Sequence, residues 1–93
     1  MILEFSCPET ERIFSGEGSR RLPTQIQQVA RRKLRMLDAS LQLHDLRIPP
    51  ANRLEALQGD RQGQHSIRIN DQWRLCFVWT EHGPARVEIV DYH

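Results

Sequence analysis

The stretch HSIRINDQWRLCFVW (65–79) decides the fold of this chain, because it reads as two strands joined by a turn. Side chains alternate between the two faces of a strand. A three-residue turn, Asn-Asp-Gln (70–72), pairs Arg68 with Arg74 and directs the apolar residues of both strands to one face. A register shifted by one residue would place an isoleucine opposite an arginine. The stretch therefore predicts an antiparallel hairpin with two arginines side by side on its outer face.

The final seven residues, VEIVDYH, predict a further strand of the same sheet. Pairing Trp79 with Ala85 directs the apolar residues of this segment toward the core. On that register Tyr92 lies diagonally from Arg74 on the outer face, and His93 lies at the same end of the sheet. The sequence thus predicts a cluster of guanidinium groups, a phenol and an imidazole.

The expected pair of arginines needs a compensating charge, because like charges directly opposite each other destabilise a sheet. A bound anion would supply that charge, and phosphate is the natural candidate because the planar fork of arginine matches it. The alternative is that the nearby acids Asp71, Glu88 or Asp91 neutralise the arginines. The residues alone leave both interpretations open.

The first half of the chain predicts helices. The segment PETERIFSG (8–16) begins with a proline and ends with a glycine, which is typical of a short helix. From Pro23 onward apolar residues recur at steps of three and four, which predicts a longer helix, and Thr24 with Gln27 resembles a capping box. Strands are expected at 2–5, 52–57, 64–69, 73–80 and 85–92. Helices followed by an antiparallel sheet predict a single α+β domain over residues 1–93.

The long helix also carries a basic stripe. Gln28, Arg31, Arg32 and Arg35 recur at helical spacing on the side opposite its apolar residues. The formal net charge of the chain is only +1, so bulk charge does not indicate a nucleic-acid partner. The stripe is therefore either a solvated outer face or a local contact with a polyanion.

Composition places the chain among ordinary globular proteins, with 39% apolar and 27% charged residues in 93. The two cysteines are far apart in sequence, and no segment resembles a signal peptide or approaches the roughly 20 apolar residues of a membrane span. A cytoplasmic protein with reduced thiols is expected. The four histidines show no metal-ligand spacing, so no metal site is expected.

The block NRLEALQGDRQGQHSIRINDQWRLCFVW, followed by a terminal VEIVDYH, resembles the HigB toxins of the RelE superfamily. The resemblance implies an α+β fold with two N-terminal helices packed on a twisted antiparallel sheet of four to five strands. It implies a toxin of a type II toxin–antitoxin system that cleaves messenger RNA in the ribosomal A site, without metal or cofactor. It also implies a HigA-like helix-turn-helix antitoxin as partner, contact with DNA only through that antitoxin, and no membrane association.

Site residues follow from the resemblance one position at a time. The arginine of QWR matches the catalytic arginine of the family, which gives Arg74, and the terminal DYH gives Asp91, Tyr92 and His93. The EAL segment resembles the EPL of the YoeB branch, whose glutamate is proposed as the general base, so Glu55 is the candidate here.

This chain departs from the family in one place. The resemblance implies LKGDR in many relatives where this chain reads LQGDR, so Gln58 replaces a lysine that helps to hold the RNA backbone or the transition state. Arg61 or Arg68 could supply the missing cation. A non-catalytic module that binds RNA or the antitoxin is the alternative function.

The implied reaction uses the neighbouring 2′-OH of the RNA as nucleophile. Glu55 is the candidate base, His93 the candidate acid, and Arg74 with Arg68 would stabilise the charged phosphorane. The roles of Glu55 and His93 can be exchanged. Tyr92 could stack on a base. Asp91 either orients His93 or is a bystander, since strand parity directs it with the core residues. The stripe formed by Arg31, Arg32 and Arg35 would then contact ribosomal RNA.

Overall fold

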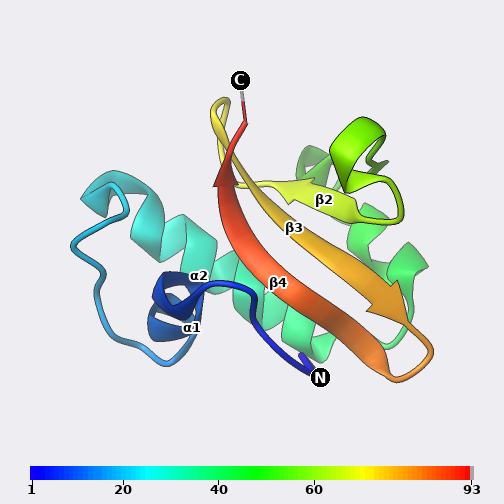
Figure 1. Cartoon of the computed structure of the whole chain (residues 1–93), viewed down its shortest axis with the longest axis horizontal. Helices are drawn as coiled ribbons and strands as arrows, with labels where there is room; N and C mark the ends of the chain where they lie inside the picture. Colours follow the sequence, from blue (N-terminus) through cyan, green and yellow to red (C-terminus); the bar gives the residue numbers. More distant parts are fainter. Residues whose placement is uncertain (93) are drawn as a thin grey trace.

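The computed structural model describes residues 1–92, in which two helices pack against one antiparallel sheet (Figure 1). The helices are α1 (Pro8–Phe14) and α2 (Thr24–Ala39). The strands follow the order β1 (Glu55–Ala56), β2 (His65–Arg68), β3 (Trp73–Thr80) and β4 (Gly83–Asp91). Short 3₁₀ helices connect them: η1 (Leu43–Arg47), η2 (Pro50–Asn52) and η3 (Gly59–Arg61). The predicted α+β class, with two helices and a sheet of four strands, is confirmed.

Helix α2 forms because its apolar residues recur with the helical period, and this stripe is the one that it buries. Ile26, Ala30, Leu34 and Leu37 are at most 3% exposed. They belong to the same buried cluster as Leu75 and other core residues of the sheet, and α2 passes behind β3 and β4 in Figure 1. Truncating a buried leucine such as Leu34 to alanine would cost about 2–5 kcal/mol.

The central hairpin has the predicted register. Ile67 pairs with Leu75 and Arg68 pairs with Arg74, and the two apolar residues are fully buried. The three-residue turn closes because the Asn70 Oδ1 atom accepts hydrogen bonds from the backbone N–H groups at 72 and 73, at 2.9 and 2.8 Å. Alternation therefore leaves the arginines on the outer face, which we define as the sheet face opposite α2.

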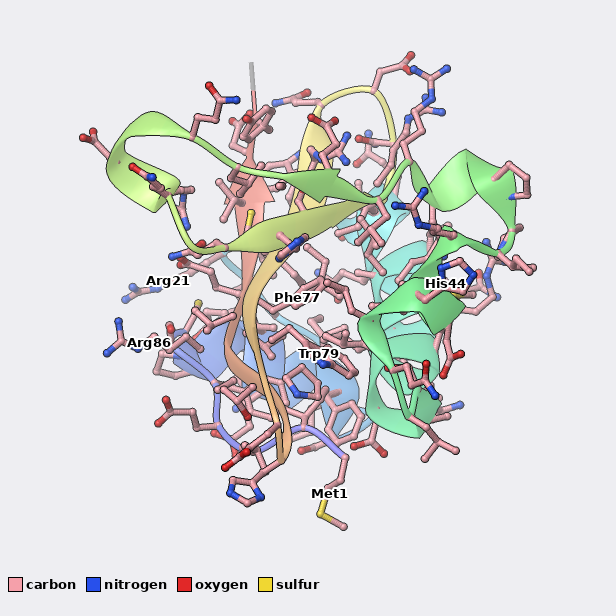
Figure 2. The ribbon with its side chains drawn as sticks, turned by 90° about the vertical axis from the view of Figure 1, so that its right-hand side faces the viewer. Met1, Arg21, His44, Phe77, Trp79 and Arg86 are labelled. Carbon is pink, nitrogen blue, oxygen red and sulfur yellow. The ribbon has the colours of Figure 1, made fainter. Side chains whose placement is uncertain are left out.

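Phe77 illustrates the other side of this alternation. It is fully buried, and Figure 2 shows it directed into the interior between the sheet and α2. Arg86, which the same view places at the surface, is exposed.

The last hairpin has the predicted register at one end only. Arg74 pairs with Val90 as predicted, but Trp79 pairs with Pro84 and not with Ala85. The cause is a β-bulge, which places one extra residue of β4 opposite β3 at Arg86, where the backbone adopts a positive φ of 51°. Hydrophobic alternation cannot reveal an inserted residue of this kind, so β4 also begins earlier than expected.

The predicted strand at 2–5 is wrong as a continuous element. Phe5 forms an isolated parallel bridge with Val87, and the Leu3 N–H donates to the carbonyl of Pro84 at 2.8 Å. This segment therefore follows the edge of β4 without becoming a regular strand.

The predicted capping box at α2 is also wrong. Pro23 occupies the N-cap position, and no side chain caps the helix. The side-chain amide of Gln27 instead bonds to the backbone of Ser19, accepting at 3.2 Å and donating at 2.8 Å. Gln27 therefore secures the loop before α2.

The strand expected over 52–57 shrinks to the two residues of β1. Asn52 belongs to η2, and Arg53 has a positive φ of 46°, a backbone conformation that a strand does not adopt. β1 is consequently a short edge strand beside β2. None of the helices in residues 1–92 has the length and apolar composition needed to cross a membrane.

Candidate functional site

Arg74 is the centre of the candidate site on the outer face. Its Nε donates to the Ser66 Oγ at 2.7 Å, and its Nη2 donates to the carbonyl of Arg53 at 2.7 Å. The residue is only 8% exposed. Because the guanidinium fork is planar and both edges are held by oxygens, its direction is fixed before any ligand arrives.

Glu55 lies beside Arg74 because β1 pairs with β2. The register places Glu55 opposite Ser66, so both side chains share the outer face. The Glu55 Oε1 atom is 3.2 Å from the Nη2 atom of Arg74, and the glutamate side chain is 49% exposed. The carboxylate is thus oriented by an ion pair and still accessible to a ligand.

Tyr92 completes this group. Its ring centroid lies 5.9 Å from the Arg74 Cζ atom, a cation–π distance, and the residue is 42% exposed. The Tyr92 N–H donates to the carbonyl of Gln72 at 2.6 Å, which joins the end of β4 to the 70–72 turn. We call Glu55, Ser66, Arg74 and Tyr92 the outer patch.

The structure describes one of the two remaining residues of the terminal DYH, Asp91, which stands outside this group. Asp91 accepts hydrogen bonds at 3.2 Å from the Gln72 Nε2 on both of its carboxylate oxygens. It is the cross-strand partner of Trp73, so it lies on the same sheet face as the core residues, as strand alternation predicted. His93 lies outside the described residues.

The paired arginines are neutralised in a way that the sequence interpretation covered only in part. Arg68 forms an ion pair with Asp71 across the turn, as the alternative interpretation proposed. Arg74 instead takes Glu55, which was not among the expected neutralising acids. The other two acids have different partners.

Glu88 is the cross-strand partner of Cys76 and forms an ion pair with Arg61. The Arg61 Nη1 is 2.8 Å from the Glu88 Oε1, and this hydrogen bond raises the pKa of Arg61. Burial raises the pKa of the Cys76 thiol, so the thiol stays protonated. Gln58 is exposed at the N-cap position of η3, and its side chain makes no capping hydrogen bond.

The predicted basic stripe does share one side of α2. Its residues line one hollow of about 400 Å³: Gln28, Arg31, Arg32 and Arg35. Arg31 differs from the others, because its Nε donates to the carbonyl of Ile13 at 2.8 Å and its Nη2 to that of Glu17 at 2.9 Å. Arg31 therefore ties α2 to the end of α1, whereas Arg32 and Arg35 are exposed.

Lys33 is a cation that the sequence interpretation missed. It is 6% exposed, and its Nζ donates to the Oδ1 of the fully buried Asn52. Burial lowers the pKa of Lys33, and the charges of Arg32 and Arg68 lower it further. Its place in the sequence, directly before Leu34 of the apolar stripe of α2, was the one sequence signal that this lysine is buried.

Two further members of the site were missed. Ser66 could have been found, since it shares strand parity with Arg68 and Arg74. The carbonyl of Arg53 could not, because it depends on a positive φ that no sequence pattern announces. Within residues 1–92, no group of three His, Cys, Asp or Glu side chains is arranged to hold a metal ion.

A family match and one relative of known type indicate the same family. Residues 3–93 match the family described as the RelE-like toxin of type II toxin-antitoxin system HigB. Toxin HigB-1 of Vibrio cholerae serotype O1 is 43% identical over 94 residues, which cover 100% of this chain and 98% of that protein. An uncharacterized protein of Haemophilus influenzae is 42% identical over 64 residues, which cover 69% of this chain and 63% of that protein. The chain therefore belongs to the family of RelE-like HigB toxins of type II toxin–antitoxin systems.

Proposed function

We propose that the toxin is a ribosome-dependent endoribonuclease, which cleaves messenger RNA in the A site and thereby inhibits translation and growth. The observation that carries the proposal is the geometry of Arg74. Its guanidinium group is almost buried and held by two oxygens, and it lies 3.2 Å from an accessible carboxylate. A fixed cation next to an exposed base is what a phosphoryl transition state needs.

The proposed reaction requires neither metal nor cofactor. The 2′-OH attacks the adjacent phosphorus, the P–O5′ bond breaks, and the products are a 2′,3′-cyclic phosphate and a 5′-hydroxyl. Glu55 takes the proton of the 2′-OH, and His93 gives a proton to the leaving oxygen, or the two exchange these roles. Each such group contributes about 10²–10⁴-fold.

Arg74 would stabilise the charge of the phosphorane in this scheme, with Arg68 as the second cation on the same face. When Arg74 binds a phosphate, its ion pair with Glu55 weakens, and the carboxylate can then accept a proton. Tyr92, half-exposed beside Arg74, would stack on a base of the RNA. Asp91 remains a candidate for orienting His93.

Other basic groups would hold the RNA and the ribosome. We assign Arg61 and Gln58 to the RNA backbone near the outer patch. Arg32 and Arg35, exposed on α2, would contact ribosomal RNA, and Arg31 would support them from its fixed position. A toxin of this class has a cognate antitoxin, and we propose a HigA-like helix-turn-helix protein in the cytoplasm as that partner.

One experiment tests the proposal directly. The chain is expressed without its antitoxin, and the 5′ ends of cellular messenger RNA are mapped beside those of an Arg74→Ala strain. New 5′-hydroxyl ends inside reading frames, absent from the variant, are expected together with growth arrest. Normal growth without new ends would refute the nuclease.

That refutation would favour the second candidate function, a degenerate toxin that only binds RNA or the antitoxin. Gln58 favours it, because this side chain is neutral where the resemblance to HigB toxins implies a lysine. Binding of RNA or antitoxin without cleavage would be its signature.

A further inference from the structure

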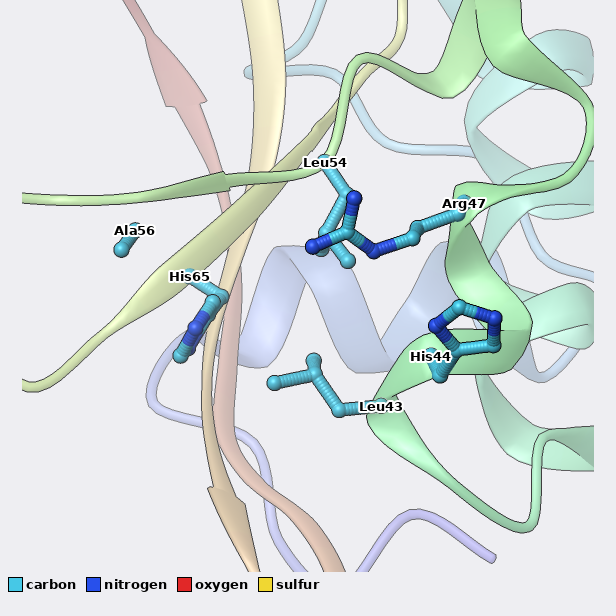
Figure 3. A pocket seen from close by; sticks show the side chains of 6 residues that line it. All are labelled: Leu43, His44, Arg47, Leu54, Ala56 and His65. Carbon is cyan, nitrogen blue, oxygen red and sulfur yellow. The ribbon is translucent and has the colours of Figure 1, made fainter.

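A second hollow lies at the edge of the sheet, behind the outer patch. It has a volume of about 380 Å³ and opens between η1 and β1 (Figure 3). Six residues line it: Leu43, His44, Arg47, Leu54, Ala56 and His65. We call it the edge hollow. Its volume falls in the range of small-molecule sites, roughly 300–1,000 Å³.

Strand alternation separates the edge hollow from the outer patch. Ala56 pairs with His65 and His65 pairs with Phe77, so these side chains share the face that α2 covers. Glu55 points to the opposite face, where it meets Arg74. The two sites are therefore back to back across a single two-residue strand. Because β1 is the edge of the sheet, no further strand of the described chain blocks passage between them.

Arg47 is the one permanently charged side chain among the six that line the edge hollow. Arg47, His44 and His65 line it, and no acid does. Two acids are adjacent in sequence to lining residues. Asp45 accepts hydrogen bonds from the backbone N–H groups of Gln42 and Leu41, which lower its pKa. Glu55 forms its ion pair with Arg74 on the outer face.

Arg47 is available for a ligand. Within residues 1–92 its guanidinium group makes no hydrogen bond or ion pair. Figure 3 shows this group reaching from η1 across the opening toward Leu54. An anion in the hollow would thus meet a cation that has no competing acid.

His65 supplies an aromatic ring to the wall of the hollow and contains a buried nitrogen without a partner. Its ring stacks on Phe77, with centroids 6.4 Å apart and an interplanar angle of 21°. Its Nδ1 atom is buried and, within the described residues, has no hydrogen-bond partner. An unpartnered polar atom in this position costs stability, about 1–3 kcal/mol. Because the atom is buried, a ligand in the hollow would pack against the accessible part of the ring and not bond to this nitrogen.

We propose that the edge hollow binds one nucleotide of single-stranded RNA, with the phosphate on Arg47 and the base against His65 and the apolar wall of Leu43 and Leu54. Histidine and arginine planes are the groups on which unstacked bases pack, and the arginine fork fits a phosphate. The inference rests on the proposed function for the identity of the ligand as RNA. It adds a second nucleotide position, on the far side of β1 from the cleaved bond.

The proposal has a specific kinetic consequence. The edge hollow touches no atom of the cleaved bond, so it would select and position the RNA without taking part in the chemistry. Loss of Arg47 should therefore raise KM for the RNA and leave kcat nearly unchanged. Loss of Arg74 should lower kcat.

The test is an NMR titration of the wild-type chain with the four nucleoside 5′-monophosphates, which contain no phosphodiester bond to cleave. Saturable shifts are expected at the backbone amides of η1, β1 and His65. Ribose 5-phosphate, which lacks the base, and inorganic phosphate should bind at least about tenfold more weakly, a difference of about 1.4 kcal/mol.

Two variants and one control sharpen the test. Arg47→Ala, an exposed position, should weaken nucleotide binding about tenfold or more. His65→Phe keeps a ring on Phe77 for the base to pack against and removes the unpartnered nitrogen, so it should raise the melting temperature of the free chain and leave nucleotide binding nearly unchanged. Arg20→Ala removes an exposed cation whose side chain makes no hydrogen bond or ion pair within residues 1–92, and it should change neither the melting temperature nor nucleotide binding.

Three outcomes would overturn the inference: no shifts at the edge hollow, equal binding of ribose 5-phosphate or phosphate (an adventitious ion only), or unchanged affinity in Arg47→Ala. None of them affects the mapping of messenger RNA ends, which tests cleavage separately. If the chain does not cleave RNA but binds nucleotides through Arg47, the edge hollow stands as a binding site and only the proposed nuclease function is refuted.

Discussion

The outer patch and the basic side of α2 both present arginines, but they hold them in opposite ways. Arg74 is 8% exposed and has the Ser66 hydroxyl, the Arg53 carbonyl and the Glu55 carboxylate as partners. Arg32 and Arg35 are exposed beside an open hollow. The partners of Arg74 fix the orientation of its guanidinium group, whereas Arg32 and Arg35 contribute positive charge to the surface without a fixed orientation.

This difference indicates two kinds of contact with RNA. Burying a cation is costly unless oxygens compensate it, so a buried arginine with a complete set of partners is preorganised for one position of a phosphate. Exposed arginines are mobile and screened by salt, and they suit a broad electrostatic contact. The contrast therefore predicts RNA cleavage at the outer patch and electrostatic binding of RNA at α2.

The largest effect is expected for Arg74→Ala. Removing the fixed cation also removes the group that orients Glu55, so cleavage of ribosome-bound messenger RNA should fall about 10³-fold or more. Arg74→Lys keeps the charge but not the planar fork, and it should recover only part of the loss. Antitoxin binding and the far-ultraviolet circular dichroism spectrum serve as controls. Near-normal cleavage by the alanine variant would remove Arg74 from the mechanism.

A smaller loss, about 10²-fold in kcat, is expected for Glu55→Gln, because the amide cannot accept the 2′-OH proton. Glu55 is half-exposed, so its ion pair should contribute at most about 1 kcal/mol to stability. Single-turnover cleavage and a urea melt measure the two quantities. A variant that unfolds more easily but cleaves normally would give Glu55 a structural role only.

The α2 side is tested by the double change Arg32→Glu and Arg35→Glu. Ribosome affinity should fall about tenfold at moderate salt. The log–log slope of affinity against salt concentration should become shallower by about one unit for each phosphate that these arginines no longer neutralise. The kcat of bound complexes should remain unchanged. Unchanged ribosome affinity would make this surface an ordinary solvated face.

Arg31 provides the matched comparison on the same helix. Its hydrogen bonds to the carbonyls of Ile13 and Glu17 hold α1 against α2, so Arg31→Glu should lower stability as well as ribosome affinity. Thermal melting separates it from the double variant, which should melt close to the wild type. Equal melting temperatures would show that the two carbonyl contacts contribute little.

The smallest effect concerns Lys33, the only lysine of the chain, which lies on α2 near Arg68. Burial lowers its pKa from 10.5 on folding, so between the folded-state and unfolded-state pKa values the unfolded chain binds more protons. Stability from this group should therefore rise with pH through that window. Lys33→Met should remove this rise, as urea titrations between pH 8 and pH 10.5 would measure. An identical pH slope in both proteins would contradict the assignment.

Sequence reasoning succeeded where one periodic pattern was sufficient. The register of the central hairpin, the pairing of Arg68 with Arg74 and the contact of Tyr92 with Arg74 all followed from the period of two along strands. It failed where local backbone geometry interrupts a pattern. The bulge at Arg86 shifted Trp79 onto Pro84, and the left-handed Arg53 cut the expected strand to two residues.

The sequence by itself therefore determined which residues face outward and which family the chain resembles, because face alternation and motif spacing are properties of neighbouring residues. Only the tertiary structure decided which oxygens hold each cation. Glu55 reaches Arg74 through strand pairing, Arg31 reaches α1 through helix packing, and Lys33 finds Asn52 in the core. Such contacts join segments that are distant in sequence, and their geometry depends on how the whole chain packs.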